Sequence, residues 1–342
     1  MSDGLPQQPS EGDWASAVAA LRGLPPRASV LLACHLNPDG DALGSMLGVA
    51  LGLRKIADEL GIARLQASYP GRSELPEPFR SLPGLDLLVA SADTDPSPDA
   101  MLAFDVASIE RLGELAERLS GAPVSIVLDH HASNTSFGKI NLVDPAAAAT
   151  SVLSDGLLRR LGVPLDAEIA ECLYVALATD TGSFKFASTT PGVHELAARL
   201  LATGIPVGDV SRRLFDTRPF GAVRLFGEAM GRARLEPDGV GFVWTYATLD
   251  DLHRFQQRPA VLEALIDAVR CVAEADVSCV VKQVADREWT VSLRSKGAVD
   301  VSAIAVALGG GGHKFAAGFT GRGSVEDVVA SIRDRLPSRL AR

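Results

Sequence analysis

The stretch CHLNPDGDALGS, residues 34–45, decides how the first half of this chain is expected to fold. It follows an apolar run at 29–34 and leads into a segment of helical apolar periodicity that begins at Ala42. Pro38 and Gly40 are turn-forming residues, so the pattern predicts a strand, a loop and a helix. One imidazole and two carboxylates therefore follow a predicted strand, at the end where open α/β sheets place their ligand sites.

Outward from this stretch, the first half alternates short apolar segments with amphipathic ones. We predict helices at 42–60 and 109–119, and strands at 29–34, 65–69, 85–90, 101–104 and 124–128. This alternation is typical of a mostly parallel sheet with helices on both faces. Beyond Asp144 the pattern becomes helical, over 146–161, 166–179, 193–202 and 207–215, until strands return at 239–246, 277–284 and 289–294.

The chain is long enough for two α/β domains, because its 342 residues exceed the usual size of one hydrophobic core. We expect a first domain at 13–205, connecting helices at 206–235 that include a helix over 220–234, and a smaller second domain at 236–342. Residues 1–12 are rich in Gly, Pro, Gln and Ser, and we expect them to be disordered.

Composition narrows the possible functions. The net charge of -9 disfavours binding to duplex nucleic acid, which requires a basic surface. The four cysteines lack CxxC spacing and favour buried thiols in a reducing compartment. The sequence shows no signal peptide and no apolar run of transmembrane length, so we expect a cytoplasmic protein that does not enter membranes.

Acidic and imidazole side chains gather where the predicted strands end. They follow three strands and the helix over 166–179, at His35, Asp39, Asp41, Asp105, Asp129, His130, His131 and Asp180. Each alone is more commonly a turn or helix-capping residue. Together at one sheet edge they would repel one another unless cations neutralised them, which favours a metal site. A carboxylate-rich set without thiolates favours Mn²⁺ or Mg²⁺, and so many ligands predict two ions.

The order of these residues resembles the four motifs of the DHH phosphoesterase superfamily. The matching segments are HLNPDGD at 35–41, the strand-terminal Asp105, the triplet Asp129-His130-His131, and TDTGSF around Asp180. The resemblance implies two manganese ions, with Mg²⁺ as a possible substitute. One would be held by His35, Asp39 and Asp105, and the other by Asp41, Asp105, His130 and Asp180.

The resemblance also implies the catalytic roles. Asp105 would bridge the two ions, and His131 would orient the substrate or protonate the leaving group. Asp129 and Asn134 would support these groups. Asn37 stands where the family often has His or Arg, outside the implied ligand set, so this departure concerns substrate contacts rather than metal binding.

The second half contains GGGGHKFAAG, residues 309–318. A run of glycines alone is also typical of a flexible linker. The apolar helix predicted over 301–308 and the Ala-Ala-Gly that follows favour an ordered anion-binding loop, in which glycines let backbone N–H groups approach a ligand. The stretch resembles the GGGHxxAAG signature of the DHHA1 domain. This implies an active site in the cleft between the domains, with substrate bound by Asn134, Arg294, Ser295, Gly310, Gly311, Gly312 and His313.

The compact two-domain form resembles the nanoRNase and pAp phosphatase branch of this family. That resemblance implies a homodimer that hydrolyses short oligoribonucleotides, pApA or cyclic di-AMP to AMP, and pAp to AMP and phosphate. The helix over 220–234 and the helices around Leu200 are candidate dimer contacts. Two other hypotheses stay open: an inorganic pyrophosphatase of the same superfamily, and a non-catalytic nucleotide-binding module.

Overall fold

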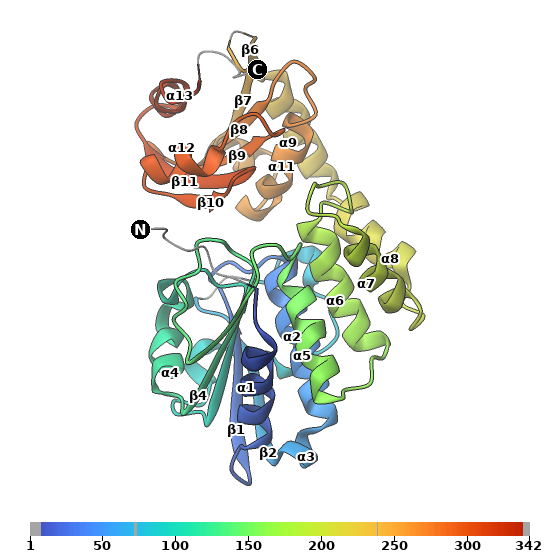
Figure 1. Ribbon diagram of the computed structural model, residues 1–342. Helices are drawn as coiled ribbons and strands as arrows, with labels where there is room; N and C mark the ends of the chain where they lie inside the picture. The colour runs from blue at the N-terminus through green and yellow to red at the C-terminus, as the bar shows by residue number, and fades with distance from the viewer. Residues whose placement is uncertain (1–7, 72–73, 238, 338–342) are drawn as a thin grey trace. The chain divides into compact units, whose positions relative to one another are not determined.

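The computed structural model describes residues 8–71, 74–237 and 239–337, which form parts of two compact units, Met1–Thr217 and Arg218–Arg342 (Figure 1). The division after Thr217 lies inside the segment 206–235, which the sequence predicts as a connector. Residues 1–7 of the predicted disordered segment lie outside the described residues. The prediction is wrong for residues 11 and 12, which begin helix α1 (Glu11–Arg22), because a capping box between Ser10 and Asp13 stabilises that helix start.

The sheet of unit 1 is parallel throughout, with the strand order β2-β1-β3-β4-β5. Its strands are β1 (Ala28–Cys34), β2 (Ile62–Ser68), β3 (Ala100–Phe104), β4 (Val124–Asp129) and β5 (Ile140–Val143). The direction of strand addition reverses between β1 and β3. In open sheets of this order, ligands bind at that switch point, beyond the carboxyl ends of the strands.

Helices cover both faces of this sheet, as the sequence predicts (Figure 1). Alternate residues of β1 enter different cores. Leu32 packs in the core beneath α2 (Gly40–Lys55), α5 (Thr150–Leu161) and α6 (Ala167–Asp180), whereas Leu31 packs against the segment that leads into α4 (Ala116–Gly121). The remaining helices of the unit are α3 (Ala57–Leu60), α7 (Pro191–Leu201) and α8 (Val207–Ser211), with a π-turn at Arg212–Asp216.

Close packing of α2 on α6 positions the residues at the sheet edge. A Cβ atom added to Gly44 would lie only 2.3 Å from the Cys172 carbonyl oxygen, so glycine is required for this approach. A Cβ atom on Gly40 would collide with Thr179. The start of α2, which carries Asp41, therefore lies directly beside the end of α6.

Several predicted elements of unit 1 are wrong. Residues 85–90 contain a 3₁₀ turn and one isolated bridge from Leu88 to Ala67 instead of a strand. The predicted helix at 109–119 is a 3₁₀ segment followed by α4, because Gly113 at φ 49° and ψ −129° breaks it. The predicted helix at 42–60 is interrupted at Ile56, and the helix predicted from 146 begins only at Thr150. Strand β5 was not predicted.

Unit 2 is a smaller α/β unit built on a mixed sheet of order β10-β11-β9-β8-β7-β6, in which only the β7–β8 pair is parallel. Its strands are β6 (Arg234–Glu236), β7 (Phe242–Ala247), β8 (Val277–Ala285), β9 (Glu288–Ser295), β10 (Gly311–His313) and β11 (Ala316–Arg322). One core contains residues of α12 (Val301–Ala307) and α13 (Val325–Arg333). The other contains residues of α9 (Phe220–Gly231), α10 (Leu249–Arg254) and α11 (Leu265–Val269).

The second unit corrects one expectation. The predicted helix at 220–234 ends at Gly231, and the chain then enters β6. The glycine-rich stretch is ordered, as predicted, and contributes β10 and the start of β11 to a hairpin.

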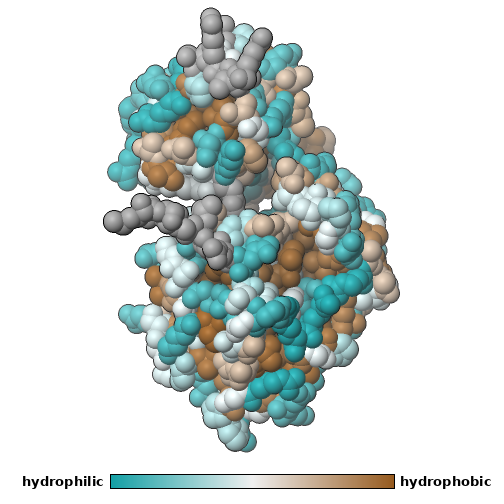
Figure 2. Space-filling model, in the orientation of Figure 1, coloured by the Kyte–Doolittle hydropathy of each residue, from teal (hydrophilic) through white to brown (hydrophobic). Residues whose placement is uncertain are grey.

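The surface of the described residues is of mixed polarity. Figure 2 shows hydrophilic and hydrophobic side chains intermixed on the viewed face of each unit. Within the described ranges, no helix combines the length and the apolar character that a bilayer-spanning segment requires.

Candidate active site

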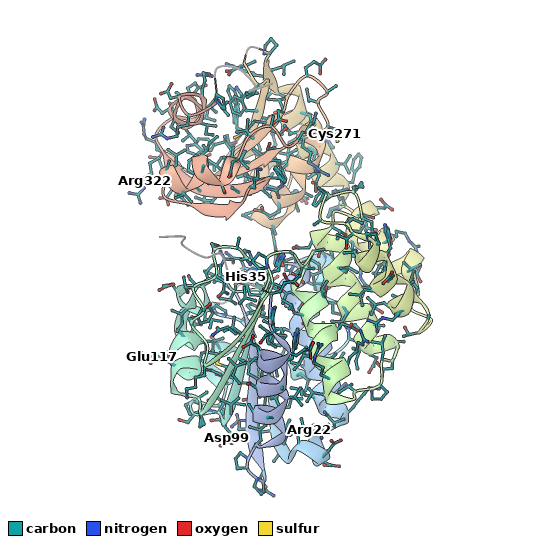
Figure 3. All side chains as sticks on the ribbon, in the orientation of Figure 1. Arg22, His35, Asp99, Glu117, Cys271 and Arg322 are labelled. Carbon is teal, nitrogen blue, oxygen red and sulfur yellow. The ribbon has the colours of Figure 1, made fainter. Side chains whose placement is uncertain are left out.

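The structure brings all the predicted metal ligands together at the carboxyl edge of the unit 1 sheet. Three overlapping groups each place their ligand atoms within 4.8 Å of one another: His35, Asp39 and Asp105; Asp41, His130 and Asp180; and Asp105, His130 and His131. We call the union of these residues the carboxylate–histidine cluster. Figure 3 shows the labelled His35 at one end of the sheet and Asp99, which precedes β3, at the opposite end.

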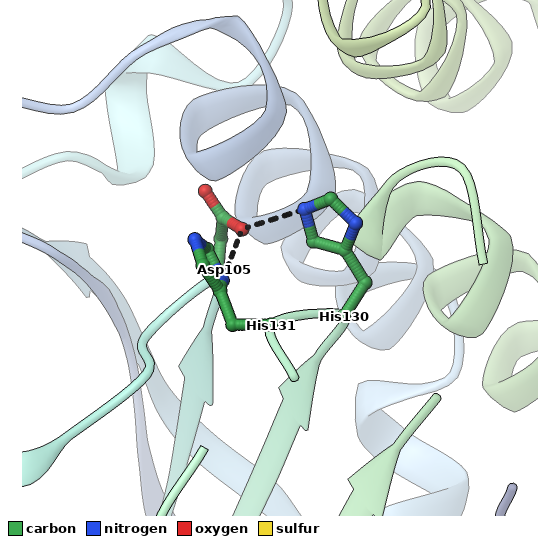
Figure 4. A group of neighbouring side chains, drawn as sticks. All are labelled: Asp105, His130 and His131. Atoms are coloured by element: carbon green, nitrogen blue, oxygen red, sulfur yellow. Dashed lines mark ion pairs between the residues drawn. The ribbon is translucent and has the colours of Figure 1, made fainter. Parts of the chain in front are cut away.

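Asp105 lies at the centre of the cluster. It follows β3 directly and adopts a left-handed backbone conformation with φ 57°, which turns its side chain at the switch point. Its Oδ1 lies 3.5 Å from both His130 Nε2 and His131 Nδ1 (Figure 4), and its Oδ2 lies 3.4 Å from His35 Nε2. Asp105 thus contacts members of both predicted ligand sets.

The charges around Asp105 oppose the effect of burial. Burial alone would raise the pKa of this carboxyl, but the hydrogen bond with His35 and the nearby charges of His131 and His130 bring it well below its usual range. Asp105 is therefore ionised when these imidazoles are protonated, and a cation in their place would serve the same purpose.

Asp41 is completely buried at the start of α2. Its Oδ1 accepts a hydrogen bond of 2.8 Å from the Ser45 hydroxyl, and its Oδ2 accepts one of 2.6 Å from the Thr150 backbone N–H. Burial and the charges of Asp105 and Asp180 nevertheless raise its pKa well above the usual range. These bonds orient the carboxylate without neutralising it.

The cluster lacks a permanent cation among the described residues. No lysine or arginine of that part of the chain forms an ion pair with its carboxylates, which are Asp39, Asp41, Asp105 and Asp180. Asp41 and Asp105 are buried, and buried like charges without a partner are costly, so this arrangement requires protons or metal ions.

Two imidazoles are oriented for metal binding. His35 Nδ1 lies 2.9 Å from the Leu36 carbonyl oxygen, and His130 Nδ1 lies 3.2 Å from the Ala147 carbonyl oxygen. A carbonyl can only accept, so each Nδ1 carries a proton and each Nε2 faces the carboxylates, where a cation could replace the Nε2 proton. This set of carboxylate oxygens with a minority of imidazole nitrogens suits Mn²⁺ or Mg²⁺.

His131 belongs to a separate hydrogen-bonded chain. Its Nδ1 lies 2.7 Å from Asp129 Oδ1, and Asn134 donates a hydrogen bond of 2.6 Å to Asp129 Oδ2. Asn134 also donates to the Val106 carbonyl and accepts from the Ser136 N–H. Burial alone would lower the pKa of His131, but Asp129 and Asp105 raise it. Asp129 and Asn134 therefore hold His131 in place.

Sequence reasoning missed the residues that hold the carboxylates. Besides its N–H bond to Asp41, Thr150 directs its hydroxyl at Asp105 Oδ1 over 3.2 Å. The other missed residues are Ser45 and Ser151, whose backbone N–H donates to Asp41 Oδ1 over 3.3 Å. Ser45 stands one helical turn after Asp41, a spacing that puts both on one face and could have indicated the contact.

In unit 2, the sheet brings the two predicted substrate-binding segments side by side. Arg294 in β9 pairs with Ala316 in β11, which in turn pairs with His313 in β10. A Cβ atom on Gly310 would lie 2.1 Å from the Gly318 carbonyl oxygen, and Gly312 has φ 135°, so both positions require glycine. Gly311 is open, with no atom within 4 Å of an added Cβ.

Ser295, at the end of β9, forms hydrogen bonds within unit 2. Its hydroxyl donates a hydrogen bond of 2.9 Å to Asp276 Oδ2 and accepts one of 3.1 Å from the Gly297 N–H.

The comparisons with known proteins agree with this geometry. Residues 29–177 match the DHH family, N-terminal domain, and residues 244–341 match the DHHA1 domain. The chain is 32% identical over 321 residues to the bifunctional oligoribonuclease and PAP phosphatase NrnA of Thermus thermophilus, covering 90% of each protein. This chain belongs to the DHH family.

Two further proteins are similar to this chain over most of its length. The bifunctional oligoribonuclease and PAP phosphatase NrnA of Bacillus subtilis is 27% identical over 297 residues, covering 85% of this chain and 88% of the relative. Among solved structures, an exopolyphosphatase-related protein from Bacteroides fragilis has a TM-score of 0.84 and 22% identity, with 95% of each chain covered. The latter similarity shows the shared fold.

Proposed function

We propose that this chain is a metal-dependent phosphoesterase that hydrolyses very short oligoribonucleotides and also converts pAp to AMP and phosphate. The observation that carries the proposal is the convergence of the cluster on Asp105, which contacts three imidazoles at the switch point of the sheet. The names of the relatives from Thermus thermophilus and Bacillus subtilis support the substrate class.

Two divalent ions would occupy the cluster, with Mn²⁺ preferred and Mg²⁺ as a substitute. His35, Asp39 and Asp105 would hold one, and Asp41, Asp105, His130 and Asp180 the other. Bound there, such ions supply Lewis acidity toward a phosphate and lower the pKa of a water molecule. The residues that keep the carboxylates and imidazoles oriented before any ligand arrives are Ser45, Thr150 and the carbonyls of Leu36 and Ala147.

His131 would deliver a proton to the leaving oxygen. Asp129 fixes its Nδ1, so its Nε2 is the atom that holds the proton to be transferred. Asn134 keeps Asp129 in position, and we assign it a supporting role for His131.

The second unit would bind the part of the substrate that does not react. The open Gly311, with Gly310 and Gly312, can bring backbone N–H groups close to a phosphate. Arg294, Ser295 and His313 would complete this subsite. Substrates with two nucleosides, such as pApA and cyclic di-AMP, fit the same scheme.

Two alternatives are less well supported. An inorganic pyrophosphatase of the superfamily would carry a different C-terminal domain, whereas residues 244–341 match the DHHA1 domain. A non-catalytic binding module would be favoured by missing ligands, yet every predicted ligand is present and lies in the cluster.

The test is a product assay with pAp, pApA, cyclic di-AMP and inorganic pyrophosphate, each with Mn²⁺ or with chelator. We expect AMP to be released from the nucleotides only when Mn²⁺ is present, with the product measured by chromatography. We expect no release of phosphate from pyrophosphate. Release of phosphate from pyrophosphate alone would establish the pyrophosphatase alternative. Binding of nucleotides without any product would establish the non-catalytic one.

A further inference from the structure

A surface pocket of about 340 Å³ lies beside the cluster within unit 1. Its lining residues are Leu36, Asn37, Pro70, Gly71, Glu110, Arg111, Gly113 and Glu114. They come from the segments that follow β1, β2 and β3, which are the strands on both sides of the switch point. Leu36 and Asn37 immediately follow the cluster residue His35.

Hydrogen bonds between these segments keep the pocket in shape. The Leu36 N–H donates to the Arg111 carbonyl oxygen over 3.1 Å. Glu114 Oε1 accepts hydrogen bonds of 2.9 Å from the Gly71 N–H and 2.5 Å from the Ser91 hydroxyl. Gly113 has φ 49°, and a Cβ atom there would lie 3.0 Å from Pro70 Cβ, so these two walls touch only because residue 113 is glycine.

Arg111 is a cation without a partner in the described part of the chain. Its exposed side chain forms no hydrogen bond or ion pair there, whereas Arg54 and Arg80 of the same unit pair with carboxylates. The backbone of Arg111 lies next to the cluster, because its carbonyl accepts the hydrogen bond from Leu36, the residue that follows His35. A free guanidinium beside a site built for phosphate chemistry is suited to bind phosphate oxygens.

The pocket itself is suited to a neutral group. Glu110 and Glu114 line it, so a phosphate placed inside would meet two carboxylates. Leu36 is 46% exposed and, with Pro70, offers apolar surface for a planar base. The Asn37 amide and the Glu114 carboxylate can bond to base or ribose groups. A volume near 340 Å³ lies in the range of small-ligand sites.

We propose that this pocket binds the nucleoside attached to the reacting phosphate, and that Arg111 contacts that phosphate. The inference rests on the proposed function, because it assumes that a nucleotide phosphate reacts at the cluster. It assigns selectivity for nucleotides over bare phosphates to unit 1, in addition to any contribution from unit 2.

The test compares binding of AMP and ribose 5-phosphate to the full-length Mn²⁺-loaded protein by titration calorimetry. Arg111→Ala should weaken binding of both ligands about tenfold to a hundredfold, because each loses a charged hydrogen bond. Leu36→Trp should fill the pocket and weaken the binding of AMP about tenfold, while the binding of ribose 5-phosphate should stay unchanged. Arg159→Ala is the matched control, since Arg159 is exposed and unpaired among the described residues but lies near the far end of α5.

Each outcome decides a part of the proposal. Unchanged binding of both ligands in Arg111→Ala would overturn the role of Arg111. Equal weakening of both ligands in Leu36→Trp would overturn the placement of the base. Leu36→Phe replaces Leu36→Trp if the larger variant has a lower melting temperature than the wild type.

The pocket and the proposed function can fail separately. If the wild type hydrolyses pAp and pApA but both variants bind AMP normally, the pocket proposal is wrong and the function stands. If the wild type hydrolyses neither, but the variants show the expected binding losses, the pocket is a nucleotide site and the proposed function is wrong.

Discussion

The cluster of unit 1 and the ion-pair group of unit 2 both bury carboxylates, but they balance the charge in different ways. In unit 2, Arg232 contacts Asp251 through Nη1 at 2.5 Å and Nη2 at 2.7 Å, and Arg254 lies 2.9 Å from the same carboxylate. In unit 1, the carboxylates of the cluster meet only imidazoles, hydroxyls and backbone N–H groups among the described residues.

This difference in charged partners shifts the pKa values of Asp251 and Asp41 in opposite directions. The hydrogen bond from Arg232 lowers the pKa of Asp251 well below its usual range, so this group stays ionised and stabilises the fold. Burial raises the pKa of Asp41 instead. A balanced buried charge is thus part of the scaffold, whereas an unbalanced one indicates a ligand site.

The largest expected effect comes from changing the central carboxylate of the unbalanced cluster. Asp105→Asn should reduce Mn²⁺-dependent hydrolysis of pAp about a thousandfold or more, because it removes the charge shared by both predicted ion sites. Asparagine tolerates the left-handed conformation at φ 57°, so the fold should be retained. The measurement is initial rate with Mn²⁺ in excess.

Melting curves supply the control for Asp105→Asn. Mn²⁺ at a hundred times its dissociation constant should stabilise the wild type by about 2.7 kcal/mol, and chelator should reverse this. Asp105→Asn should lose most of that gain, measured against its own metal-free melting temperature. A variant that keeps both its activity and its Mn²⁺ stabilisation would refute the central role of Asp105.

The ligands could be predicted from the sequence because of how a parallel sheet is built. His35, Asp105 and His130 each follow an apolar run, and the carboxyl ends of parallel strands meet at one edge. Asp180 follows the helix predicted over 166–179 rather than a strand, and the resemblance to a family motif supported its inclusion. The position of the active site thus followed from the local pattern and one topological rule.

The late start of α5, which the sequence did not predict, depends on a local side-chain hydrogen bond that overrides helix propensity. The alanines at 146–149 favour a helix, yet Asp144 accepts a hydrogen bond from the Ala146 N–H and holds the chain in a turn. That turn presents the Ala147 carbonyl to His130 and lets α5 begin at Thr150, with its first N–H groups directed at Asp41. A helix from 146 would have placed Thr150 inside its second turn.

The balanced group of unit 2 should respond in the opposite way, through stability. Asp251→Asn should lower the free energy of unfolding at pH 7 by about 2–4 kcal/mol, since it leaves two guanidinium groups with one charged partner fewer. Activity per folded molecule should be unchanged. The measurement is the midpoint of unfolding in urea, with unfolding detected by circular dichroism.

The stability difference between the wild type and Asp251→Asn should depend on pH. The pKa of Asp251 is lowered from 3.8 in the folded state, so its contribution is present above about pH 4 and is lost as the pH falls below that value. The gap between wild type and Asp251→Asn should therefore narrow in acid. Asp267→Asn is the control, because Asp267 is 59% exposed in a single pair with Arg270 and should cost less than about 0.5 kcal/mol. A gap that widens in acid would contradict the assignment.

The smallest expected effect tests whether neutral donors tune the unbalanced cluster. Thr150 holds both carboxylates, with its N–H on Asp41 and its hydroxyl on Asp105. Thr150→Val keeps the shape and the backbone bond but removes the hydroxyl, so Asp105 loses an orienting donor. Mn²⁺ affinity should fall about tenfold, measured as free Mn²⁺ by electron paramagnetic resonance, because partners that orient ligands contribute about that much. Thr150→Ser restores the hydroxyl and should bind Mn²⁺ like the wild type. Equal Mn²⁺ affinities in the valine and serine variants would show that the Thr150 hydroxyl does not help to position the carboxylates. The difference between the two units would then lie only in the charged partners of their carboxylates.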